Sequence, residues 1–530
     1  MPVWPKSFHT FGLSLKTAAT EWKLRRKRAA AVGQERTRRH LLGRLATTEH
    51  WRNAGLQPKM SYAEFQSRVP LQTYASLAPA IERMRGGEPN VLWPGVCALF
   101  GLSSGTTKGE AKYIPATENL LEHFRRGVRD ALLYYTVRAR HAGIFRGRHL
   151  LLGSSSKLAT LGGTAGHQAY AAELSGILPL VLPDWAEKHL YEPGSTIAQA
   201  ADWDALVDGI VGRTCRCDVT VIAGVPKWVA QFATELYARY AQSGQPIRDL
   251  QQIWPNLEVF VHSGATIAPF AAELHALLGP AVKFHETYVA TEAFVATQDT
   301  DAPAAGLRLM ADLGVFFEFL PLSEFDDARV SQLGAKAVSL DAAQPGVDYA
   351  LIVTTPGGLV RYVMEDVVRF ITTAPPRLIH RGRTTLRLHA FGENVLEREI
   401  VEALVAVCSR NQWSIVNFHV APLLTNNLTG QQRGRHEWWV ELKAGTISTP
   451  TGPQIAGGLD GELQRCNPDY AAKRKAGILD VPFVRLVMPG VFEHWQRYQQ
   501  RWGAQHRFGR CRNDRSIADD LAQITNFARD

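Results

Sequence analysis

The chain has 530 residues, a formal net charge of +9 and 45% apolar residues, which describes a globular protein of more than one domain rather than a disordered or fibrous one. No apolar run reaches the length that a membrane-spanning helix needs, and no compact apolar segment marks a secretory leader. Its six scattered cysteines do not form a disulfide framework, so we expect reduced thiols and a soluble, cytoplasmic protein.

The first expected helical region, residues 16–51, carries much of the positive charge. Eight lysines and arginines fall between Lys23 and Arg39. Such a cluster can bind nucleic acid or an anionic membrane. It is more often the solvated face of a helix, and no aromatic stacking pattern accompanies it here. We therefore expect neither a nucleic-acid nor a membrane partner, with nucleic-acid binding through this helix kept as an alternative.

A stretch rich in Gly, Ser and Thr follows the first expected strand, the apolar run 96–102. It consists of Ser103-Ser-Gly-Thr-Thr-Lys-Gly-Glu-Ala-Lys112. Glycine lets backbone N–H groups approach an anion, the hydroxyls add neutral donors, and lysine adds charge. This is the chemistry of a loop that holds a polyphosphate, although the spacing is not the Walker pattern. The alternative is a polar strand-to-helix turn that binds nothing.

Strands and helices then alternate. A helix over 119–140 has apolar residues at helical spacing. The further expected elements are strands over 149–152, 219–223 and 257–262 and helices over 198–213 and 228–240. This alternation predicts a parallel sheet covered by helices on both faces, and ligands bind at the carboxyl ends of such strands.

The pattern changes after about residue 305. Shorter, antiparallel strands are expected over 307–320, 348–355 and 359–372. Residues 382–394 are rich in Arg, Thr and Gly and are predicted to link two domains. Beyond them the sequence predicts a helix over 397–409, strands over 413–421 and 436–442, and helices over 459–466 and from 470. The fold class is therefore α/β, with an antiparallel or barrel-like part.

Three segments in order resemble the nucleotide motifs of the Gretchen Hagen-type (auxin-responsive) acyl acid–amido synthetases. These enzymes are related to the acyl-CoA synthetase and luciferase adenylating enzymes. The first motif is the stretch from Ser103 to Lys112, continuing to Pro115; the second is Glu286-Thr-Tyr-Val-Ala-Thr-Glu-Ala-Phe294 and contains Glu292; the third runs from Thr354 to Val368 and contains Asp366. The resemblance extends from about Phe65 to near the C-terminus.

The resemblance implies a large N-terminal adenylating domain, residues 1–385, and a small mobile α/β C-terminal domain, residues 386–530. It implies an enzyme that uses ATP and Mg²⁺ to activate a carboxylic acid as an acyl-adenylate. The acyl group then passes to the amine of an amino acid, with release of AMP and pyrophosphate. The implied partners are small-molecule substrates, and we expect a monomer.

The resemblance also assigns roles to individual residues. The phosphates would be held by Ser103, Ser104, Gly105, Thr106 and Thr107, with Lys108 or Lys112 nearby. Glu292 would be the Mg²⁺ ligand, since a hard dication takes few carboxylates plus phosphate oxygens. Tyr288, Thr291, Asp366 and Arg383 would complete the nucleotide site, with Asp366 accepting from both ribose hydroxyls. Alternatively, Glu292 is a surface carboxylate, and Asp366 pairs with Arg361 or Arg369.

Four positions depart from the family pattern, and one of them is Phe317, where a tyrosine is more usual. Arg507 stands at the usual catalytic lysine, Gly509 at a usual proline, and Glu365 at the glycine that usually precedes the aspartate. Arginine keeps the charge, but its planar fork differs from a point charge. Arg383 to Glu393 is the expected hinge between the domains.

The acyl pocket is the part that the sequence defines least. Arg125, Trp228 and Leu161 are its candidate residues, and a helix-surface arginine and core packing explain them as well. The rival functions are an acyl-CoA-forming ligase and a degenerate nucleotide-binding or regulatory homologue.

Overall fold

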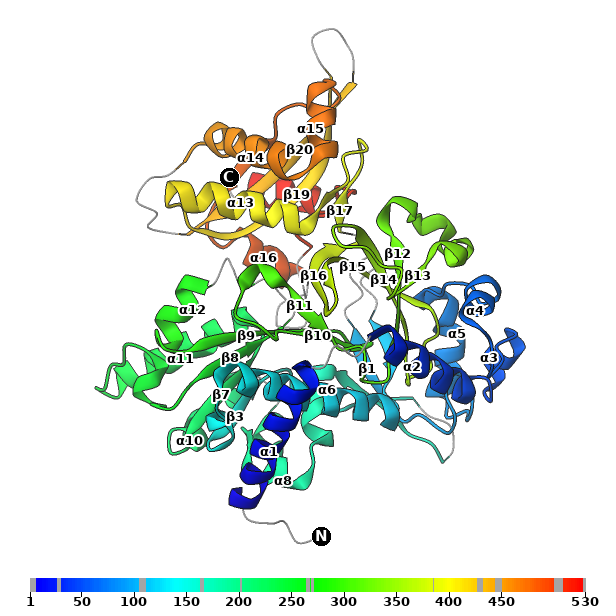
Figure 1. Cartoon of the computed structure of the whole chain (residues 1–530). Coiled ribbons are helices and arrows are strands. Elements are labelled where there is room, and N and C mark those ends of the chain that lie inside the picture. The colour runs from blue at the N-terminus through cyan, green and yellow to red at the C-terminus, as the bar shows by residue number, and fades with distance from the viewer. Residues whose placement is uncertain are drawn as a thin grey trace. The chain divides into compact units, whose positions relative to one another are not determined.

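The computed structural model describes the chain except residues 1–5, 26–29, 104–110, 163–165, 201–202, 264–266, 268–270, 385, 427–431, 444–449, 500–508 and 528–530. Figure 1 shows the whole chain. It divides into two compact units. Unit 1 comprises Met1–Ser103, Ala111–Met364 and Arg369–Ile379, and the described part of unit 2 comprises Glu365–Val368 and residues from His380 onward. The six cysteines are free thiols.

Unit 1 begins with separate helices, and the first three of them take the place of the one helical region expected over 16–51. They are α1 (Lys6–Arg25), α2 (Ala30–Leu45), α3 (Glu49–Asn53), α4 (Tyr62–Arg68) and α5 (Tyr74–Arg85). Not all of the basic cluster is solvated. Arg38 is 1% exposed, donates to the carbonyl of Met60 and pairs with Glu35. Part of this charge is therefore structural.

The predicted parallel sheet is present in unit 1. Its strands, in spatial order, are β9 (Lys283–Val289), β8 (Val259–His262), β7 (Val219–Gly224), β3 (Arg148–Leu152) and β6 (Tyr191–Glu192), all parallel to their neighbours. Helices α10 (Trp203–Thr214), α11 (Pro226–Gln242) and α12 (Ala271–Leu278) pack on one face. Helices α1 and α6 (Glu118–Ala139) contribute to the apolar cluster on the other, so both faces are covered.

The same sheet continues beyond β9 through antiparallel strands. In order they are β10 (Phe294–Thr297), β11 (Leu307–Leu309), β16 (Pro376–Arg383), β15 (Tyr362–Thr373), β14 (Asp348–Thr354), β12 (Phe316–Pro321) and β13 (Val338–Ser339). The change to antiparallel pairing after residue 305 was predicted. Strands β9, β10 and β16 were not, because polar motif residues interrupt their apolar pattern.

A separate four-stranded sheet has the order β2 (Lys112–Pro115), β1 (Leu99–Ser103), β5 (Ala169–Glu173) and β4 (Ala159–Leu161). The short helices α7 (Leu174–Ile177), α8 (Asp184–His189) and α9 (Ser195–Ala198) complete unit 1. The described helices include none long and apolar enough to cross a membrane.

Unit 2 is built on a three-stranded sheet, β19 (Ile415–Asn426), β20 (Gln432–Leu442) and β21 (Phe483–Val487). Helices α13 (Glu397–Asn411), α14 (Gly452–Cys466) and α15 (Pro468–Lys475) share a core with it that includes Trp438. Helices α16 (Val491–Tyr498) and α17 (Ser516–Phe527) pack around Trp439, the next residue along β20. Successive strand residues face opposite sides of a sheet, so both faces of β20 are buried.

Candidate functional site

The first motif lies on a β-hairpin. Strands β1 and β2 pair antiparallel, and Ser103 lies opposite Lys112 at the point where the loop leaves the sheet. Both side chains are half-buried. The loop therefore joins two strands rather than a strand and a helix, and its phosphate binding stays a prediction. Ser104, Gly105, Thr106, Thr107 and Lys108 lie outside the described residues.

The second motif forms a tight turn between β9 and β10. The backbone N–H of Ala290 donates to the carbonyl of Ala293 at 3.0 Å, and that of Ala293 donates back at 3.3 Å. Thr291 and Glu292 are therefore the two central residues of a hairpin turn, which leaves their backbone little freedom. Glu292 is only 6% exposed, so it is not the surface carboxylate of the alternative interpretation. Tyr288 is buried near the end of β9.

The strand that leads into the first motif is in direct contact with the turn of the second motif. A Cβ atom built on Gly101 of β1 would lie 2.6 Å from Cγ2 of Thr291, a distance that real Cβ atoms do not adopt. Only glycine at this position lets the β9–β10 turn pack against the strand that leads into the first motif. The sequence placed these segments 190 residues apart without indicating this contact.

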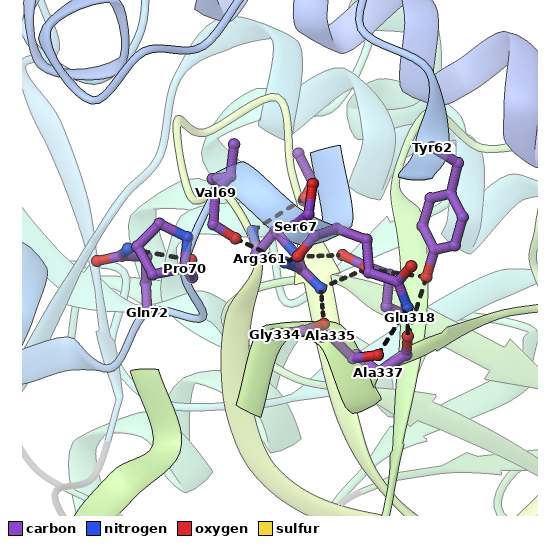
Figure 2. A network of polar contacts seen from close by, with 12 residues as sticks. Tyr62, Ser67, Val69, Pro70, Gln72, Glu318, Gly334, Ala335, Ala337 and Arg361 are labelled. Atoms are coloured by element: carbon purple, nitrogen blue, oxygen red, sulfur yellow. Dashed lines mark hydrogen bonds and ion pairs between the residues drawn. The ribbon is translucent and has the colours of Figure 1, made fainter. Parts of the chain in front are cut away.

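The third motif is held by Arg361, which is fully buried with a backbone φ of +47°. Figure 2 shows its guanidinium at the centre of a polar network. Nε and Nη2 donate to the two carboxylate oxygens of Glu318 at 3.1 and 2.9 Å. Nη1 donates to the carbonyls of Gln66 and Val69, and Nη2 also donates to that of Gly334. All five N–H donors of the guanidinium are thus engaged.

Two consequences follow from this network. Arg361 is not the partner of Asp366, so that alternative interpretation is wrong. The backbone of Arg361 accepts from the N–H of Gln72, and the N–H of Val363 donates back to the carbonyl of Gln72, each at 2.9 Å. The start of the third motif is therefore fixed to the segment between α4 and α5.

Asp366 is buried on β15 and has two cationic or titratable neighbours within unit 2. His380 Nε2 lies 3.4 Å and Arg383 Nε 3.6 Å from the same carboxylate oxygen, Oδ1. Both neighbours come from β16. Arg369, the other proposed partner, pairs with Asp348. Asp366 and Arg383, both predicted site residues, are therefore brought together by the structure.

Glu365 adopts a left-handed backbone conformation, with φ +65°. Within a strand, such a residue is usually glycine at a bulge, because a side chain is strained there. The carbonyl of Glu365 accepts from the N–H of Thr384 at 2.7 Å, which fixes the strained residue in place. The left-handed conformation explains why glycine, which adopts it without strain, usually precedes the aspartate of the third motif.

The predicted acyl-pocket residues do not line one described cavity. Arg125 pairs with Glu118 and Glu122 on its own helix. Leu161 is buried at the end of β4, and Trp228 is half-buried in the first turn of α11. A small cleft at the carboxyl end of β3 is lined by Ser154, Ser175, Tyr191 and other residues, and none of the three predicted pocket residues is among them.

The expected hinge segment is largely anchored within unit 2. Asn513 accepts from the N–H of His389 at 2.8 Å and donates to the carbonyl of Arg387 at 2.6 Å. Glu393 accepts from the ring of His436 at 3.0 Å, and both side chains are fully buried. Burial, the largest single cause, raises the pKa of Glu393, but the hydrogen bond and charge of His436 and the backbone hydrogen bonds together outweigh it, so the pKa is lowered.

Of the last predicted motif, Arg507 lies outside the described residues. The carbonyl of Gly509 accepts from Nδ1 of the buried His419 at 2.8 Å. For the described residues, no group of three or more His, Cys, Asp or Glu side chains could hold a metal ion. A Mg²⁺ ion that takes most ligands from nucleotide phosphates and water needs only one or two carboxylates, so a single buried carboxylate such as Glu292 fits that kind of site.

Three domain models of one family match the chain in order. The GH3 family N-terminal domain matches residues 21–176, the central domain residues 308–383 and the C-terminal domain residues 398–516. Among curated proteins, the chain is 25% identical to an indole-3-acetic acid-amido synthetase, GH3.8 of Oryza sativa subsp. indica, over 90% of this chain and 87% of that protein. It is 23% identical to a jasmonoyl–L-amino acid synthetase, JAR4 of Nicotiana attenuata, over 73% and 75%.

Solved structures show the same fold. The GH3.15 acyl acid amido synthetase superposes with a TM-score of 0.71 at 17% identity, over 93% of each chain. A 2-hydroxyisobutyryl-CoA ligase in the postadenylation state superposes with a TM-score of 0.55 at 13% identity, over 94% of this chain and 91% of that one. The predicted α/β fold is thereby confirmed.

Proposed function

Because the chain belongs to the GH3 family, we infer that it is an acyl acid–amido synthetase, and we propose that ATP and Mg²⁺ drive its reaction. The observation that best supports the proposal is the contact between Gly101, on the strand that leads into the first motif, and Thr291, on the turn carrying Glu292. Adenylation requires donors for the phosphates and a carboxylate for the metal ion, and these two segments carry such residues.

In the proposed first step, the substrate carboxylate attacks the α-phosphorus of ATP, and pyrophosphate leaves. Ser103 and the loop after it hold the phosphates, and Lys112 adds positive charge at the base of the hairpin. Bound Mg²⁺, held by Glu292, would neutralise phosphate charge. Tyr288 packs beside the adenine, and Asp366 accepts hydrogen bonds from the ribose hydroxyls. Arg383, with Nε 3.6 Å from Oδ1 of Asp366, adds a positive charge beside that carboxylate.

In the proposed second step, an amino acid amine attacks the acyl carbonyl, and AMP leaves. The amine must be neutral, and water must be excluded to prevent hydrolysis of the adenylate. We propose that residues 386–530 form a lid that supplies Arg507 to the adenylate phosphate. Arg125, Trp228 and Leu161 remain proposed acyl-acid contacts, and we propose a monomeric, cytoplasmic enzyme.

The decisive experiment incubates the purified full chain with ATP, Mg²⁺ and a panel of aliphatic and aromatic acids, and measures pyrophosphate release. Each active acid is then paired with the common amino acids, and the amide is identified by mass spectrometry. Coenzyme A as the acceptor tests the rival thioester-forming ligase. Acid-dependent pyrophosphate release followed by an amide supports the proposal. Nucleotide binding without pyrophosphate release, from folded protein and a broad panel, would instead indicate a degenerate homologue.

A further inference from the structure

His123 lies on α6 and is 2% exposed, and its ring joins two other elements. Nε2 accepts a hydrogen bond from the backbone N–H of Phe294, at 2.8 Å. Nδ1 lies 3.0 Å from the carbonyl oxygen of Leu313. Because Nε2 accepts, the ring proton of the neutral imidazole is on Nδ1, which donates to Leu313. Both hydrogen bonds thus require one tautomer.

Phe294 is only two residues beyond Glu292. It opens β10, where it pairs with Val289 of β9, and the turn between them carries Thr291 and Glu292. The hydrogen bond that the N–H of Phe294 donates to His123 therefore fixes the backbone at the end of the turn that presents the buried carboxylate.

Close packing holds this turn at two further points. A Cβ atom built on Gly127, one helical turn beyond His123, would lie 2.5 Å from the ring of Phe294. On the strand that leads into the first motif, Gly101 packs against the methyl group of Thr291. The two glycines thus allow close packing against Phe294 and Thr291, and the hydrogen bond between His123 and the backbone of Phe294 adds a directional contact.

We propose that His123 is a positioning residue for the adenylation step, acting through the backbone of Phe294 to fix the Glu292 carboxylate. This inference rests on the proposed function, because it requires Glu292 to hold the metal ion. A purely structural histidine would contribute to stability alone. A positioning residue would also set the affinity for the metal–nucleotide complex.

Two substitutions at His123 distinguish the roles of its two ring nitrogens. The amide of His123→Gln can place an acceptor near the position of Nε2, so the Phe294 contact can be retained. The shorter amide of His123→Asn can replace Nδ1 opposite Leu313, but it leaves the N–H of Phe294 without its acceptor. His149→Asn is the matched control, because His149 also lies in unit 1 and its ring bonds a single carbonyl, that of Ile144 at 2.9 Å.

The probe is Mn²⁺ with α,β-methylene-ATP, whose binding is followed by water proton relaxation without any turnover. Loss of an outer partner of a metal ligand typically costs about 10-fold to 100-fold in metal affinity. We therefore expect His123→Asn to bind the complex about tenfold more weakly, with the KM for the acid unchanged, and His123→Gln to bind it nearly as well as the wild type. His149→Asn should lower only the melting temperature.

Gly127→Ala provides an independent perturbation if His123→Asn does not fold, because the added methyl group would displace Phe294 from the other side. It too should weaken metal–nucleotide binding. Glu292→Gln serves as the reference. If Glu292→Gln weakens binding while both His123→Asn and Gly127→Ala bind as the wild type does, His123 is structural and the inference fails alone. If Glu292→Gln binds as well as the wild type, the proposed site fails, and the inference fails with it.

Discussion

Replacing Glu365 by glycine should stabilise the protein, although it removes a side chain. Glu365 has a φ of +65°. A side chain in the left-handed region costs roughly 1–2 kcal/mol. Glycine has no such cost, but its freer unfolded chain loses roughly 0.5–1 kcal/mol on folding. The expected net gain is about 0.5–1 kcal/mol, which corresponds to a rise of about 0.5–1 °C in the melting temperature when a chain of this length unfolds as one unit.

Thermal unfolding followed by calorimetry measures this gain, with two comparison variants. Glu365→Ala removes the carboxylate but keeps the strain, so it should give no gain. Gln412→Gly changes an exposed left-handed residue, φ +57°, at the end of α13, and should give a similar gain away from Asp366. If Glu365→Ala stabilises as much as Glu365→Gly, the carboxylate rather than the backbone is responsible, and the reasoning is wrong.

Three further predictions concern buried charge and the site. Arg361→Met should destabilise by about 3–5 kcal/mol in chemical denaturation, because Glu318 remains buried and unpaired, and adding Glu318→Gln should recover part of that loss. Asp366→Asn should raise the KM for ATP about 10-fold or more while the KM for the acid stays constant, since hydrogen bonds to a charged group contribute about 1.5–3 kcal/mol; equal changes in both would contradict a ribose contact. Burial lowers the pKa of His262 and His419 to about 4. The unfolded chain therefore binds protons first as the pH falls, and the free energy of unfolding should drop between about pH 6.5 and 4, by up to about 1.4 kcal/mol per pH unit for each ring. A free energy of unfolding that does not change over that range would contradict neutral buried rings.

The sequence predicted the elements with strong periodicity. The helix expected over 119–140 is α6, and the alternating strands and helices after it form the parallel sheet. These predictions succeeded because apolar spacing depends on local chain geometry. Strands β9 and β10 were not predicted because their ends carry motif residues chosen for chemistry, which obscure the apolar pattern.

Long-range contacts at the site could not be predicted. His123 looked like one residue of a helix, and only the folded chain brings it to the backbone of Phe294. Glycine at 101 and 127 gave no signal, since an absent side chain matters only when the opposing residue is known. Arg361 was considered as a partner for Asp366, which is near in sequence, whereas its partner Glu318 lies on another strand. The function was predicted from the order of the three motifs along the chain. Which side chains pair with one another could be learned only from the structure.

The Arg361 network also limits when this protein can fold during its synthesis. The guanidinium donates to the carbonyl of Val69 across 292 residues of chain. A ribosome that adds about 5–20 residues per second takes roughly 15–60 s to make that interval. Until Arg361 emerges, the carbonyls between α4 and α5 and the carboxylate of Glu318 lack the cation that allows them to be buried. The segment around Val69 can therefore reach its final buried packing only after Arg361, in the last third of the chain, has been synthesised.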